Sequence, residues 1–286
     1  MLYGLRALSK PLRRALFWAK AEGKDQTATP LVPAPSKEVH ISSEAESQTV
    51  TQASATDKLK FTILGNETHA VQIDLSPGQS VRAEAGSLAY MSSGVEMETN
   101  LVGGIGASFK RILAGSSLML TDFTYKGTEE SGRVVFSPEH PSKILPLRLS
   151  DHNGTIICAK DSYLCSEPQL ILEVAFVQKM SFGFFGGEGF VLQKILGDGL
   201  VLLKGGGVVI EKTLAVDEEI RVATGNLMAI EDTVAYDLKV ISGFKNVIFG
   251  GEGLFLTTLK GPGRVYLQSM PFSRIVSTVL QHLPHK

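Results

Sequence analysis

The stretch Phe185-Gly186-Gly187-Glu188-Gly189 returns unchanged at Phe249-Gly250-Gly251-Glu252-Gly253, a shift of 64 positions along the chain. The same shift superposes Leu192 on Leu256, so the similarity extends beyond the two glycine-rich motifs. Self-similarity at a fixed spacing indicates tandem structural units, each of which buries its apolar face against its neighbours. We therefore predict a fold that is built from repeats.

A third and more divergent copy lies earlier in the chain. The segment from Val81 to Leu88 resembles Ile220 to Leu227, and Gly115 to Thr121 follows the pattern of Gly251 to Thr257. This copy has Ser116 where the other two have glutamate. The sequence therefore predicts three units, which cover about residues 61–148, 149–212 and 213–270.

The units have the hydrophobic pattern of strands. From Leu59 onward apolar residues recur with a period of two, as in Val234 to Val240 and Leu170 to Phe176, which indicates strands with one face in a core. Turn sequences separate these runs, because glycine and asparagine accept positive φ and proline fixes φ. These turns are Ser76-Pro77-Gly78, Asp151-His152-Asn153-Gly154, Gly197-Asp198-Gly199 and Gly261-Pro262-Gly263. We expect an all-β fold with one sandwich or barrel per unit.

The C-terminus has a different period. Between Pro271 and Pro284 the apolar residues recur at helical spacing, which predicts an amphipathic helix over residues 272–283. Its apolar stripe must be buried on its own body, on a partner or on a bilayer surface. Burial on its own body is the expected outcome.

The first 58 residues lack the strand pattern. Residues 1–20 contain five basic residues and no acid before Glu22, interleaved with leucines and aromatic residues, which is typical of an organelle transit segment. The alternative is an amphipathic helix that stays on the mature protein at a membrane surface. Residues 21–58 are rich in Thr, Pro, Ser, Ala and Gln and are expected to form a disordered linker, so the folded domain should span 59–286.

Composition excludes several protein classes. The chain is 43% hydrophobic and 20% charged, which is typical of a globular body, and it has no apolar run of the roughly 18 residues that a membrane span needs. From residue 61 onward acidic residues outnumber basic ones, so we expect no nucleic-acid partner. Cys158 and Cys165 match no disulfide, zinc or redox spacing and are expected to be buried.

The two glycine-rich motifs are interpreted as structural turns or bulges. A dinucleotide fingerprint needs a following helix and a phosphate loop needs a lysine, whereas both motifs run on into apolar strand sequence. The residues assigned this structural role are Gly186, Gly187, Glu188, Gly189, Gly250, Gly251, Glu252 and Gly253. No histidine recurs between the repeats and no nucleophile motif is present, so the sequence predicts no catalytic, cofactor-binding or metal-binding residues and no enzyme.

Several of these segments together resemble a known family. Val81 to Leu88, Ser108 to Arg111 with Gly115, and the two Phe-Gly-Gly-Glu-Gly motifs look like the altered-inheritance-of-mitochondria family. This family is the mitochondrial branch of the TRAP-like superfamily, which is named for the trp RNA-binding attenuation protein. The resemblance covers about residues 59–286.

The resemblance implies three β-sandwich units, related to the double-stranded β-helix, in a pseudo-threefold body. It also implies a mitochondrial protein, associated with the inner membrane, that supports the cristae-organising machinery and the respiratory complexes and has no established catalytic activity. The serine at Ser116 places in doubt any role that needs three equivalent carboxylates. RNA binding is not implied, because the repeats lack the clustered basic residues that the attenuation protein uses.

The favoured hypothesis is a non-enzymatic scaffold in the mitochondrial matrix or peripherally on the inner membrane, with homo-oligomerisation left open. Two alternatives remain: a small-ligand-binding β-barrel module and an RNA-binding ring. Fold-level analogy alone does not choose among them.

Overall fold

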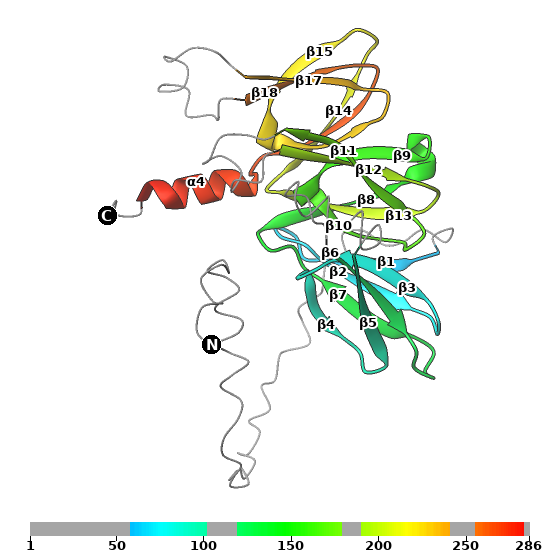
Figure 1. Cartoon of the computed structure of the whole chain (residues 1–286). Coiled ribbons are helices and arrows are strands. Elements are labelled where there is room, and N and C mark those ends of the chain that lie inside the picture. Colours follow the sequence, from blue (N-terminus) through cyan, green and yellow to red (C-terminus); the bar gives the residue numbers. More distant parts are fainter. Residues whose placement is uncertain (1–57, 102–118, 179–189, 241–254, 283–286) are drawn as a thin grey trace, which may run out of the picture. The chain divides into compact units, whose positions relative to one another are not determined.

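The protein is described by a computed structural model that covers residues 58–101, 119–178, 190–240 and 255–282. The regular secondary structure of these residues is almost entirely β-strand, and it ends in one short helix (Figure 1). The predicted all-β class with a short C-terminal helix is therefore confirmed. The predicted transit segment 1–20, the predicted linker up to residue 57 and both glycine-rich motifs lie outside the described residues.

The strands form four antiparallel sheets. The first sheet has the order β1 (Lys60–Leu64), β2 (Ala70–Leu75), β7 (Gly132–Phe136), β4 (Leu88–Met91). The second has the order β5 (Val95–Leu101), β6 (Met119–Tyr125), β3 (Ser80–Glu84), β10 (Tyr163–Ser166), β13 (Leu200–Gly206), β8 (Ser142–Arg148).

The third sheet has the order β11 (Ile171–Gln178), β12 (Phe190–Leu196), β9 (Thr155–Ala159), β16 (Leu227–Glu231), β19 (Gly263–Gln268), β14 (Val209–Leu214). The fourth has the order β15 (Glu219–Ala223), β18 (Phe255–Lys260), β17 (Ala235–Val240). Three 3-10 turns, η1 (Leu149–His152), η2 (Lys160–Ser162) and η3 (Thr224–Asn226), connect strands, and α4 spans Phe272–His282.

One order of pairing recurs along the chain. The orders β2-β7-β4, β8-β13-β10 and β14-β19-β16 correspond, and so do β5-β6-β3, β11-β12-β9 and β17-β18-β15. We call β2–β7 set 1, β8–β13 set 2 and β14–β19 set 3. The register shifts at the same place in each set, between Leu88 and Tyr90, between Tyr163 and Cys165, and between Leu227 and Ala229. The symmetry that relates the three sets remains a prediction.

Hydrogen bonds assign β8 to set 2. This strand, Ser142–Arg148, pairs along its whole length with β13, whereas the sequence placed it at the end of the first unit. Set 2 therefore begins at Ser142 when the boundary is drawn by strand pairing.

The sheets cross from one set to the next. Strand β3 of set 1 pairs with β10 of set 2, with Ala83 opposite Cys165, and β9 of set 2 pairs with β16 of set 3, with Cys158 opposite Ala229. Three clusters of buried apolar side chains form the core, and each cluster draws residues from more than one set. The two cysteines lie in these clusters with no exposed surface, as predicted, and burial raises the pKa of Cys158 to about 12.

The predicted turns are found where the structure describes them, and the predicted alternation is found in part, because Val174 on the expected core face is 36% exposed. On β11, Leu172 is buried and its neighbour Ile171 is 57% exposed. Gly78 has φ of +80° and Asn153 has φ of +53°, in two of the predicted turns. These residues fit because glycine and asparagine tolerate the left-handed region.

Helix α4 follows β19 and contacts the sheets at its first turn. The Phe272 ring lies 5.2 Å from the His140 ring, and the Arg274 guanidinium bonds the Asn226 side chain. Phe272 remains 45% exposed and Val279 55% exposed. The expected burial of the apolar stripe on the protein's own body is therefore incomplete.

Candidate functional site

Polar side chains are buried where one set joins the next. The first group, which we call the Lys204 cluster, contains Lys204 on β13, Glu84 at the end of β3 and His140 before β8. The Lys204 ammonium and the Glu84 carboxylate form an ion pair in which the lysine side chain is only 4% exposed. The pair therefore links a strand of set 1 to a strand of set 2.

The electrostatics of this pair follow from its burial. Burial raises the pKa of Glu84, and the attraction and hydrogen bond of Lys204 oppose that shift without cancelling it. Two charges with so little solvent contact lose the favourable free energy of hydration. Only an ion pair of good geometry compensates for that loss. Neither charge can be removed singly without leaving the other unpaired.

His140 lies beside this pair. Burial first, and then the positive charge of Lys204, lower the pKa of His140, so its ring is neutral at pH 7. Its Nε2 is buried and has no hydrogen-bond partner among the described residues. The ring packs on Phe272, so the cluster contacts the first residue of α4.

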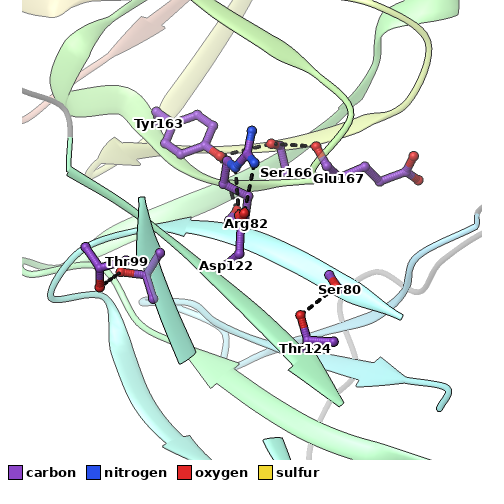
Figure 2. Close-up of polar contacts among 9 residues, drawn as sticks. Ser80, Arg82, Thr99, Asp122, Thr124, Tyr163, Ser166 and Glu167 are labelled. Carbon is purple, nitrogen blue, oxygen red and sulfur yellow. Dashed lines mark hydrogen bonds and ion pairs between the residues drawn. The ribbon is translucent and has the colours of Figure 1, made fainter. Parts of the chain in front are cut away.

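A second polar group lies on the same set boundary, along β3 and β10 (Figure 2). Arg82 holds Asp122 of β6 through two bonds, of 2.7 Å from Nε and 2.9 Å from a terminal nitrogen. The buried Tyr163 hydroxyl donates to the Arg82 carbonyl over 3.2 Å and shares a hydrogen bond of 2.9 Å with Ser166. These contacts fix β3 against β10.

The third group joins set 2 to set 3. His152 Nδ1 and Glu231 Oε1 lie 2.9 Å apart, and the Arg264 guanidinium donates to the same oxygen over 2.7 Å. The Arg264 backbone N–H donates to Glu231 Oε2 over 2.8 Å. The carboxylate therefore receives donors on both oxygens, and the His152 side chain is 2% exposed.

Each of these groups pairs a carboxylate with a basic side chain, so that Glu84 is held by Lys204, Asp122 by Arg82 and Glu231 by Arg264. Among the described residues no cluster of His, Cys, Asp and Glu is arranged to hold a metal ion. Within the same residues no helix has the length and apolar character needed to span a bilayer.

One pocket opens at the surface of set 2, close to Lys58 at the start of the described residues. It has a volume of about 200 Å³, and its lining includes Arg148, Glu167 and Asp198. Ligand pockets are typically of about 300–1,000 Å³ and mostly apolar. This depression is smaller than that range and therefore gives little support to the small-ligand alternative.

The sequence and the structure indicate different residues. All eight residues assigned to the glycine-rich motifs, Gly186 to Gly189 and Gly250 to Gly253, lie outside the described residues, so their structural role stays a prediction. Sequence reasoning missed Glu84 and Lys204, which are 120 positions apart. The available signal was a lysine that follows the apolar residues Val201 to Leu203 and precedes three glycines.

Comparisons with known proteins agree with this architecture. The family described as "Mitochondrial biogenesis AIM24" matches residues 61–270. An uncharacterized protein of Streptococcus pyogenes serotype M6 is 26% identical over 236 residues, which cover 80% of this chain and 92% of that protein. A crystal structure of a Streptococcus pyogenes protein, at 24% identity, has the same fold with a TM-score of 0.65, over 79% of this chain and all of that one.

The family match covers most of the chain and almost all of its strands. It confirms the resemblance that the repeated glycine-rich motifs and the Val81 to Leu88 segment indicated. The chain belongs to the mitochondrial biogenesis AIM24 family.

Proposed function

We propose that this protein is a non-enzymatic scaffold of mitochondria, which binds protein complexes of the inner membrane and supports cristae organisation and respiratory-complex integrity. Family membership suggests a role related to mitochondrial biogenesis, which is the coarser part of this proposal. The basic, acid-free composition of residues 1–20 supports import into mitochondria.

The observation that carries the proposal is the exposed apolar face of α4. The first turn is held on the sheets by Phe272 and Arg274, so the helix has a fixed base. Further along, Val279 is 55% exposed, although burying a large apolar side chain is worth about 1.5 to 3 kcal/mol. A helix of this kind supplies a contact surface for a partner.

The partner that we propose is a membrane protein rather than lipid. Lipid-binding interfacial helices have lysines and arginines on the polar face. Residues 272–282 contain Arg274 as their one basic residue apart from His282. Arg274 already bonds the Ser269 carbonyl and the Asn226 side chain.

The test is a single charge on the exposed face. In cells that lack the native protein, Val279→Asp should release the protein from mitochondrial membranes and fail to restore cristae, while the Tm of the purified variant stays within about 2 °C of wild type. Thr278→Asp, at the adjacent exposed position, is the matched control and should retain membrane association. Continued association of Val279→Asp with membranes would overturn the role of α4.

Lipid binding is tested separately. Wild-type protein should leave membranes on alkaline extraction and should not bind protein-free liposomes. Salt-insensitive binding to such liposomes, lost in Val279→Asp, would show that the helix anchors the protein in lipid directly.

The absence of catalysis is tested at the Lys204 cluster. A double variant, Glu84→Gln with Lys204→Met, removes both buried charges together and should still restore cristae in cells if the role is structural. If this variant folds with a cooperative transition and yet fails to restore function, the cluster is a chemical site and the protein is not a simple scaffold.

A further inference from the structure

The two boundaries between sets are built in the same way and in the same register. At the first, Cys165 and Ser166 of β10 lie opposite Ala83 and Arg82 of β3. At the second, the corresponding residues of β16 and β9 pair identically, with Ala229 opposite Cys158 and Ile230 opposite Ile157. The edge of one set is therefore shaped to receive the edge of the next.

Two edges of this type have no partner strand in the described part of the chain. Strand β4 of set 1 corresponds to β10 and β16, and it ends the first sheet. Strand β15 of set 3 corresponds to β3 and β9, and it ends the fourth sheet (Figure 1). The free edge of β4 is of the kind that β10 and β16 present at the internal boundaries, and the free edge of β15 is of the kind that β3 and β9 present. The two free edges are therefore complementary.

The side chains on the β4 edge are those expected of an unfilled interface. Tyr90 is 53% exposed and Met91 is 36% exposed. The residues at the corresponding positions of set 2, Cys165 and Ser166, have no exposed surface, and they lie at a boundary where β10 is paired with β3. An exposed edge strand with large apolar side chains is a template for pairing with another chain.

We infer that β4 of one copy of this protein pairs in antiparallel fashion with β15 of a second copy. The register of the two internal boundaries places Tyr90 opposite Val222 and Met91 opposite Arg221 of the other copy. The contact joins two different surfaces, so it repeats head to tail and gives a ring or a filament. It involves neither α4 nor the Lys204 cluster, and it is independent of the proposed scaffold role.

The first test changes the charge of the residue that faces Arg221 across the proposed strand pair. Met91→Lys places a lysine opposite Arg221, and like charges directly opposite each other are unfavourable. Sedimentation velocity of the full chain should show assemblies for wild type and association weakened at least about tenfold for Met91→Lys. Adding Arg221→Glu to Met91→Lys should restore assembly, whereas Val208→Lys, at another exposed apolar residue, should leave it unchanged.

The second test reads the register. Chains with Tyr90→Cys, mixed with chains with Val222→Cys, should form disulfide-linked dimers under mild oxidation, because facing Cα atoms on paired strands lie within disulfide range. The native Cys158 and Cys165 are fully buried and should not interfere. Tyr90→Cys mixed with Glu219→Cys, three positions out of register, should not cross-link.

Three results would overturn the inference. The first is a wild-type chain that stays monomeric at about 100 μM, because its dissociation constant would then exceed that of typical specific complexes. The second is assembly that neither Met91→Lys nor the charge exchange affects. The third is a disulfide within one chain in the Tyr90→Cys, Val222→Cys double variant, which would mean that the two edges close on each other in a monomer.

Discussion

At the scale of single residues, Glu231 makes the stability depend on pH. Burial by itself raises the pKa of Glu231, but the hydrogen bonds from the Arg264 backbone and side chain and from His152 together lower it below the ordinary value of 4.5. A carboxylate with a lowered folded-state pKa stabilises the fold fully above its unfolded pKa. This contribution is lost as the pH falls through the folded pKa.

We therefore expect Glu231→Gln to be less stable than wild type by about 1 to 3 kcal/mol at pH 7. The gap should narrow as the pH is lowered from about 5 toward 3, where the wild-type carboxylate takes up its proton. Thermal melts across this range measure it, with Glu173→Gln on β11 as a control at an exposed glutamate. A gap that stays constant down to pH 3 would contradict this account.

The Lys204 cluster gives the second residue-scale prediction. Glu84→Gln leaves the lysine charge buried without its carboxylate and should cost about 3 to 5 kcal/mol. The double variant that also carries Lys204→Met has no buried charge, so it should recover most of that loss. Urea unfolding at pH 7 compares the two, and equal instability of the single and double variants would rule out an ion-pair origin.

The sequence predicts the burial of a residue well only where burial follows from the local backbone geometry. Alternation along a strand is a property of the backbone, so the buried Leu172 and the exposed Ile171 could be assigned from their neighbours. The Glu84–Lys204 pair depends on β3, β10 and β13 lying side by side across a set boundary. Nothing local to either residue contains that information.

At the scale of elements, the β6–β7 connection depends on a glycine. A Cβ at Gly132, the first residue of β7, would overlap the ring of Tyr125, which is 2% exposed in the core. Gly132→Ala should therefore cost about 1 to 3 kcal/mol through overpacking. In a Tyr125→Leu background the same change should cost much less, and strictly additive effects in the double-mutant cycle would refute the steric explanation.

The elements themselves were predicted more fully than their surroundings. The helix expected over 272–283 is observed over Phe272–His282, because Pro271 and the helical spacing that follows are local signals. Its burial agrees with the prediction only in part, since Ile275 and Val276 are half-buried and Val279 remains 55% exposed. Exposure depends on where the contacts of Phe272 and Arg274 direct the helix, and those contacts include His140 and Asn226, which are more than 40 positions away.

At the scale of the whole molecule, the sequence predicts that the folded body begins near residue 59, and the described residues include side chains of that region in the core. Leu59 and Phe61 are buried at 1% and 5% exposure, and the Gln79 side chain donates to the Lys58 carbonyl over 2.7 Å. Deleting residues 1–57 should change the Tm by less than about 5 °C, whereas deleting 1–61 should lower it further by removing two core side chains. Differential scanning calorimetry decides, and a large loss from the shorter deletion would move the boundary toward the N-terminus.

The shared sheets also predict how the molecule unfolds. Strands β3 and β10 are hydrogen-bonded across one set boundary, and β9 and β16 across the other. No set can therefore unfold without breaking the strand pairing of a sheet that it shares with its neighbour. Cys158, Cys165 and Ala229 lie on these boundary strands and have no exposed surface. The three sets should therefore unfold in one cooperative transition, with calorimetric and van't Hoff enthalpies that agree.

A chain truncated after Gly206 tests whether the folding of sets 1 and 2 depends on set 3. It lacks set 3 and exposes the β9 edge together with the Cys158 side of the set 2 core, so it should aggregate or lose its cooperative transition. A chain truncated after Met270 lacks α4 but keeps every strand that the structure describes. Its unfolding should remain cooperative. If the chain ending at Gly206 melts reversibly with a stability like that of the whole, or if the intact body shows separate transitions for its sets, then the boundaries are contacts between independent domains rather than parts of one core.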